Sequence, residues 1–155
     1  MDKPDFVPRN LRIIPGLNSV AERGRNVPEA GEILDRLAAS GLRGRGGGWF
    51  PTALKWRAVR AEGGDPVVIA NGAEGEPGSV KDRHVMTTRP ALVLEGLALA
   101  AAAMGAREGI VFLKASSDRP AAALAAALAA GAAGGLPVTI ARGDDGYVTG
   151  EETAL

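Results

Sequence analysis

The sequence predicts an α/β fold: a Rossmann-like layered arrangement in which a short, mainly parallel sheet is flanked by helices. Three short apolar runs rich in β-branched residues, at 66–70, 109–113 and 137–141, are typical of buried strands. Apolar, alanine-rich stretches with helical character alternate with them, and a strand–helix–strand order implies a parallel, right-handed crossover. Ligands of open α/β sheets bind beyond the carboxyl ends of the strands, so the loops there are the expected site.

The composition suits one globular domain and excludes several kinds of site. The chain has 155 residues, 46% of them hydrophobic, and Lys+Arg and Asp+Glu balance at 18 each. A neutral balance gives no support for binding nucleic acid or an anionic membrane surface. The longest apolar run, 91–104, is too short to cross a membrane, so no membrane insertion is expected. Cysteine is absent and His84 is the single histidine, which argues against disulfides, iron–sulfur clusters and other metal centres in this chain. Residues 1–10 lack the apolar core of a signal peptide, so a cytoplasmic location is expected.

The first elements lead into a glycine-rich loop. Residues 1–27 form a lead segment for which little structure is predicted, and the domain is expected over 28–155. From Pro28, apolar residues at helical spacing predict a helix that Gly41 ends. A second helix is predicted from Pro51 to Glu62, since proline favours a helix start and glycines follow its end.

The stretch GLRGRGGGWFPTALKW, residues 41–56, is the strongest candidate for a binding loop. Glycines let several backbone N–H groups approach one anion, and the dipole of the following helix points the same way. The loop is neither a Walker motif, which needs Gly-Lys before Ser or Thr, nor a dinucleotide fingerprint, because position 49 is Trp. The alternative is a plain flexible linker.

The second candidate loop is NGAEGEPGSVKDR, residues 71–83, which follows the first predicted strand. Helices are predicted from Pro90 to Met104 and from about Arg119 to Ala130, and the chain ends in GYVTGEETAL, typical of a loop entering a helix. Other interpretations stay open. In the second loop, Glu74 and Glu76 can be a solvated acidic surface, and Lys81, Asp82 and Arg83 can form a local ion-pair network that fixes the loop. Glu151 and Glu152 can cap a helix, and Trp49 and Trp56 can simply pack.

The three segments GLRGRGGGWFPTALKW, NGAEGEPGSVKDR and GEETAL, in this order, resemble the FMN-binding domain of the NADH-oxidising flavoprotein subunit of respiratory complex I. The flavoprotein subunits of soluble hydrogenases and formate dehydrogenases share this domain. The resemblance covers roughly residue 28 to the C-terminus. Against the family pattern, the domain is expected to be incomplete, since the family continues past GEETAL into a ubiquitin-like insert and a cluster-binding helical domain.

The resemblance implies an oxidoreductase in which NADH passes a hydride to FMN, and the electrons then move to an iron–sulfur partner subunit or domain. The cofactor performs this chemistry, so no catalytic side chain is implied. The residues implied to bind FMN are Gly44, Gly46, Gly47, Lys55, Asn71, Glu74, Gly150 and Glu151. Those implied to bind NADH are Phe50, Glu76 and Glu152.

Three positions depart from the family pattern. Trp49 stands where the family has glycine, Ala73 where it has aspartate, and Ala58 where it has a phenylalanine that would clamp the nucleotide. Two alternatives to an active flavin domain therefore follow: a homologue that kept the scaffold as a binding or interaction module, and a fragment that is marginally stable alone.

Overall fold

The computed structural model describes residues 27–45 and 48–151. The lead segment predicted over 1–27 thus lies outside the described residues except for Val27. The elements of the described part are, in order, α1 (Ala30–Ala39), α2 (Thr52–Glu62), β1 (Val68–Asn71), α3 (Lys81–Thr88), α4 (Pro90–Met104), β2 (Gly109–Lys114), α5 (Asp118–Ala129) and β3 (Val138–Gly143).

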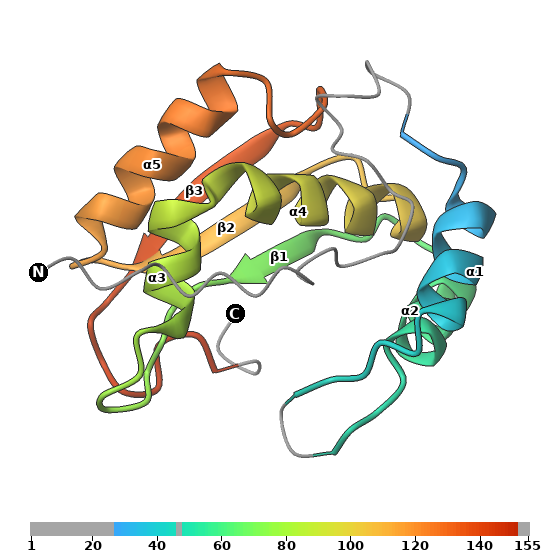
Figure 1. Cartoon of the computed structure of the whole chain (residues 1–155), viewed down its shortest axis with the longest axis horizontal. Helices are drawn as coiled ribbons and strands as arrows, with labels where there is room; N and C mark the ends of the chain where they lie inside the picture. The colour runs from blue at the N-terminus through green and yellow to red at the C-terminus, as the bar shows by residue number, and fades with distance from the viewer. Residues whose placement is uncertain (1–26, 46–47, 152–155) are drawn as a thin grey trace, which may run out of the picture.

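The three strands form one parallel sheet in the order β1-β2-β3, which confirms the predicted α/β fold (Figure 1). The register places Gly109 of β2 opposite both Val68 of β1 and Val138 of β3. All carboxyl ends therefore reach the same edge of the sheet, called here the carboxyl edge. The loops after β1, β2 and β3 meet there, as the sequence predicts.

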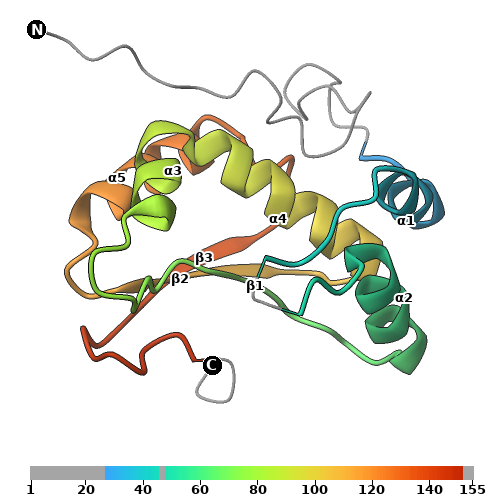
Figure 2. The same ribbon diagram turned by 60° about the horizontal axis from the view of Figure 1, so that its bottom comes forward.

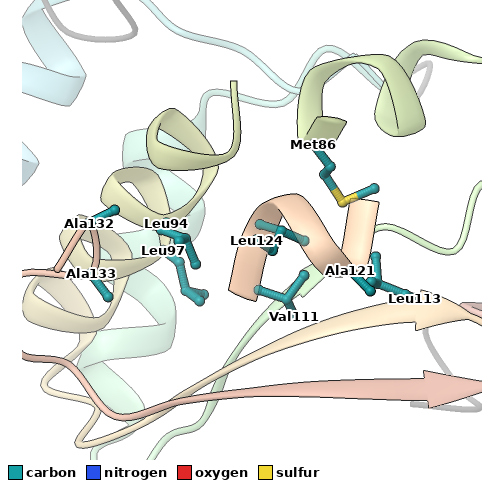
Figure 3. Close-up of a cluster of buried hydrophobic side chains, with 9 residues drawn as sticks. All are labelled: Met86, Leu94, Leu97, Val111, Leu113, Ala121, Leu124, Ala132 and Ala133. Atoms are coloured by element: carbon teal, nitrogen blue, oxygen red, sulfur yellow. The ribbon is translucent and has the colours of Figure 1, made fainter. Parts of the chain in front are cut away.

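Helices α3, α4 and α5 cover one face of the sheet, as Figure 2 shows. Along β2, alternate residues point into this layer, and Val111 and Leu113 are fully buried. Figure 3 shows the cluster that they form with residues of the three helices and the α5–β3 loop: Met86, Leu94, Leu97, Ala121, Leu124, Ala132 and Ala133. The other face carries no helix within the described part, and Ile69 and Phe112 lie on it.

Helices α1 and α2 form a separate hairpin that packs against the C-terminal end of α4 (Figure 2). Ile33 is fully buried and joins Ala103 in a second cluster, which Trp56 also contacts. The Arg60 guanidinium donates a hydrogen bond of 2.5 Å to the Ala103 carbonyl. The α1–α2 hairpin, which carries the glycine loop, is therefore held on the sheet layer by its packing against the C-terminal end of α4.

Helix α3 is the element that the sequence does not predict, since the pattern over 71–83 indicates a loop and the next predicted helix begins only at Pro90. The helix ends at Thr88, and α4 begins at Pro90 after a bend of 99°, with Arg89 between them in a non-helical conformation. A residue before proline is disfavoured in the α conformation, which separates the two helices. Helix α3 buries only Met86, so it shows no apolar periodicity.

Within the described residues, none of the helices alone has the length and apolar character needed to span a bilayer; only the bent pair α3 and α4, taken together, meets those criteria.

Candidate functional site

The carboxyl edge brings together two residues that are far apart in the sequence, Asn71 and Gly150. Asn71 is the last residue of β1, and the segment after β3 returns along the edge toward it (Figure 1). The Asn71 side-chain amide donates a hydrogen bond of 2.5 Å to the Gly150 carbonyl, and its oxygen accepts one of 3.2 Å from the Ala73 amide. One side chain thus ties the loop after β1 to the segment after β3.

Glycine is required where these two segments meet. Gly150 has a φ of 89°, and a Cβ there would lie 2.6 Å from the Ala73 Cβ and 2.8 Å from the Asn71 oxygen. At Gly75 a Cβ would lie 2.7 Å from the Tyr147 carbonyl oxygen. The segment after β3 therefore packs directly on the loop after β1 and leaves no room for a side chain at either glycine.

The side chain of Glu74 is 5% exposed, and its carboxylate holds the N-terminus of α3. It accepts hydrogen bonds from the Ser79 hydroxyl at 2.5 Å, the Asp82 amide at 3.2 Å and the Arg83 amide at 3.4 Å. These two amides belong to the first turn of α3, whose donors have no partner inside the helix. Glu74 therefore acts as the cap that Val80, at the N-cap position, lacks.

These contacts lower the pKa of the Glu74 carboxyl below its ordinary value. Burial by itself raises this pKa, but the hydrogen bonds from Ser79, Asp82 and Arg83 and the charge of Lys81 outweigh it. The Lys81 ammonium lies 3.9 Å from the Glu74 carboxylate and 2.5 Å from that of Asp82. Lys81 and Asp82 of the predicted ion-pair network therefore pair with each other, whereas Arg83 contacts Glu74 through its backbone amide.

A polar cavity of about 180 Å³ opens at the carboxyl edge beside this loop. Lys114 at the end of β2 and Asp145 after β3 line it together with Glu74. The Asp145 carboxylate accepts bonds from the Ser116 amide at 3.0 Å and from its hydroxyl at 2.7 Å. The sequence analysis did not predict Lys114, Ser116 and Asp145 as site residues. Their positions shortly after two predicted strands could have indicated them.

The glycine loop is closed at its base instead of being an open linker. The Gly44 amide donates to the Phe50 carbonyl at 2.9 Å, and the Thr52 amide donates to the Leu42 carbonyl at 3.0 Å. The Arg43 guanidinium adds a bond of 3.1 Å to the Trp49 carbonyl. The loop thus begins and ends beside the N-terminus of α2, as the sequence predicts.

Each of the remaining predicted residues is either exposed or outside the described residues. Lys55 on α2, Phe50, Glu76 and Glu151 are exposed, whereas Gly46, Gly47 and Glu152 lie outside the described residues. Figure 1 shows the glycine loop standing apart from the carboxyl edge. The structure therefore brings Asn71, Glu74 and Gly150 together, and it places Gly44, Phe50 and Lys55 in a second group on the hairpin.

An open parallel sheet with glycine-dependent loops at its carboxyl edge is the architecture of nucleotide-binding α/β domains. The model of one such family, the Nuo51 FMN-binding domain, matches residues 37–155. The chain belongs to this family, whose cofactor is FMN.

The proteins that this chain resembles are longer than the chain itself. It is 37% identical over 137 residues to an NADH-quinone oxidoreductase subunit of Rhodobacter capsulatus, covering 79% of this chain and 32% of that protein. It is 48% identical over 84 residues to the alpha subunit of the NAD-reducing hydrogenase HoxS of Cupriavidus necator, covering 54% and 14%. A crystal structure of an NAD+-reducing [NiFe]-hydrogenase matches with a TM-score of 0.78 and 37% identity over 90% of this chain and 25% of that one. The chain therefore spans about a third or less of the length of these relatives.

The residues present fit a phosphate-bearing flavin. Arg43, Arg45 and Lys55 are exposed cations around the glycine loop, which suits a phosphate. The carboxyl edge offers the exposed Asn71 side chain, whose amide suits the polar atoms of a flavin and its ribityl chain.

Proposed function

We propose that this chain is the FMN-binding part of an NADH dehydrogenase-type flavoprotein that receives a hydride from NADH and passes electrons to a partner. The observation that carries the proposal is the family match, which extends over the glycine loop, the loop after β1 and the segment after β3. These are the segments that surround the carboxyl edge and the start of α2 in this fold.

In this proposal the chain's residues bind and orient the cofactor. Gly44, with Gly46 and Gly47, lets the backbone approach FMN, and Lys55 supplies a positive charge from α2. Asn71, Gly150 and Glu151 border it from the carboxyl edge. Glu74 is proposed to contact it too, and its bonds to α3 favour a role in shaping the loop. Bound FMN supplies the acceptor for hydride and the donor of single electrons.

The proposed NADH contacts lie on exposed parts of the same loops. Phe50 offers an aromatic ring for a nucleotide base, and Glu76, with Glu152, offers carboxylates that accept hydrogen bonds from hydroxyls. Because the chain has no cysteine, the proposed electron acceptor is an iron–sulfur subunit or domain outside this chain.

A flavin titration of the purified chain tests the proposal. We expect FMN to bind with a Kd in the range of about 1–10 μM and riboflavin to bind more weakly, because the cationic loop recognises the phosphate. Lys55→Ala and Asn71→Ala should weaken FMN binding, whereas Arg107→Ala, an exposed cation before β2 and therefore at the opposite edge, should leave it unchanged. Reduction of the bound flavin by NADH without oxygen then tests the donor. A folded chain that binds no FMN would refute the proposal.

A second candidate function is an interaction module that has lost turnover. The observation that favours it is the sheet face without a helix in the described part, where Ile69 and Phe112 lie. The departures at Ala58 and Ala73 point the same way. Folded, colourless protein that takes up no FMN in the titration would favour this candidate.

A further inference from the structure

Trp49 is a large aromatic residue in a position that favours glycine. Its φ is 48°, and it is the one non-glycine residue with a positive φ in the described part of the chain. A bulky residue in this region is strained, and such residues persist where the surrounding structure holds them. Strained positions of this kind cluster at ligand-binding segments, so Trp49 requires an explanation.

Two arginines hold this residue. The Arg43 guanidinium donates to its carbonyl at 3.1 Å, and the Arg45 guanidinium lies 5.3 Å from the centre of its ring. The second distance is that of a cation–π contact. The loop base also fixes the neighbouring Phe50, whose carbonyl accepts from the Gly44 amide. The backbone at 49 and one face of the indole are therefore both restrained.

The held ring does not pack in the core. Trp49 is 57% exposed and Phe50 is 56% exposed, whereas Trp56, the other tryptophan, packs between α1, α2 and α4. The packing interpretation therefore holds for Trp56 and not for Trp49. With Arg45 against the ring, more than half of the Trp49 surface is still open to solvent beside two arginines.

We propose that Trp49 is a stacking platform whose exposed face receives the planar aromatic ring of a phosphate-bearing nucleotide, with the isoalloxazine of FMN as the ring. This inference rests on the proposed function. Indole is electron-rich and isoalloxazine is electron-poor, so their stacking is favourable, and Arg43 and Arg45 stand close enough to attract the phosphate. The tryptophan thus adds ring recognition to a loop that otherwise recognises only an anion.

The test is FMN binding to four proteins: wild type, Trp49→Phe, Trp49→Ala and Trp49→Gly, followed through the emission of the flavin itself, with circular dichroism confirming that each is folded. We expect Trp49→Ala to weaken binding roughly ten-fold and Trp49→Phe to retain most of the affinity. Trp49→Gly is decisive, since glycine relieves the strained φ but removes the ring. It should also lose affinity, and tighter binding by this variant would show that the indole obstructs the flavin.

A second experiment and the pattern of FMN binding distinguish an error in this inference from an error in the proposed function. In a Trp56→Phe background, Trp49 is the only tryptophan, and FMN should quench its emission more strongly than AMP does. Stronger quenching by AMP would overturn the flavin as the stacked ring. FMN binding that is equal in all four proteins would overturn the role of Trp49 and leave the proposed function standing. Absence of FMN binding to folded wild-type protein would overturn both.

Discussion

At the scale of single residues, Glu74 shows how a residue expected in a ligand site can act first on the protein itself. The family resemblance implies contact with FMN, and the structure gives its carboxylate three hydrogen-bond donors at the start of α3. A carboxylate at a helix N-terminus is favourable both as an acceptor and through the helix dipole. The loop that carries Asn71 and Glu76 is thereby anchored at both ends: to Gly150 through Asn71, and to α3 through Glu74.

We expect Glu74→Gln to lower the free energy of unfolding at pH 7 by about 1 kcal/mol, since the amide group replaces one acceptor oxygen with a donor that faces other donors. The pKa of Glu74 is lowered in the folded protein, so its contribution is fully present above the ordinary value of 4.5 and is lost as the pH falls through the folded value. The difference between wild type and variant in urea unfolding should therefore shrink below about pH 4.5.

The matched control for this experiment is Glu76→Gln, an exposed glutamate on the same loop. It should leave unfolding nearly unchanged at both pH values. A difference between wild type and Glu74→Gln that stayed constant from pH 7 to pH 3 would contradict the capping role of the ionised carboxylate.

At the scale of elements, the segment 144–151 is a strap that lies along the carboxyl edge and is held at its two ends. Asp145 bonds to Ser116 before α5, and Gly150 bonds to Asn71, the last residue of β1. Between these points the strap exposes Tyr147 and Val148. Hydrogen bonds from the Ser116 hydroxyl and amide, aided by the charge of Lys114, lower the pKa of the Asp145 carboxyl against a small opposing effect of burial.

We expect Asp145→Ala to release the first end of the strap without unfolding the domain, because the side chain is exposed and contacts no core residue. Amide hydrogen exchange should become faster at 146–151 and stay unchanged in β2 and α4. Acidification through the lowered pKa of Asp145 should produce the same local change in the wild type. Asp144→Ala, a neighbouring exposed carboxylate, is the control. Unchanged exchange in the Asp145 variant would show that the strap is held by the Asn71 contact alone.

The sequence predicts those elements whose start and stop signals lie within or next to the element itself. Helix α4 runs from Pro90 to Met104 as predicted, since proline starts it and Gly105 ends it with a φ of 77°. The strands are found within two or three residues of the predicted bounds. Helix α3 could not be predicted, because Val80 is a poor N-cap and the cap comes from Glu74, several residues earlier. The Ser116–Asp145 contact likewise depends on the pairing of β2 with β3, which cannot be predicted from a local sequence pattern.

At the scale of the whole molecule, the proposed flavin residues are divided between two bodies of structure. Asn71 and Gly150 belong to the sheet layer, and Gly44 and Lys55 belong to the α1–α2 hairpin. The hairpin packs on the C-terminal end of α4 through Ile33, Ala103 and Trp56. Both groups can contact one FMN only if this packing holds the hairpin in a fixed position relative to the sheet.

We therefore expect Ile33→Ala to weaken FMN binding although Ile33 belongs to neither group of proposed flavin residues. The residue is fully buried, so the substitution should lower the free energy of unfolding by about 2–4 kcal/mol and loosen the hairpin.

Leu124→Ala is the matched control. Leu124 is equally buried but lies in the core between α5 and the sheet, so its substitution should lower the stability by a similar amount and leave the hairpin in place. At temperatures where both variants are folded, FMN affinity should fall several-fold in the first and little in the second, and Trp56 emission should shift only in the first. Equal affinity in the two variants would mean that the flavin does not bridge the hairpin and the sheet, and that one of the two groups of residues binds it alone.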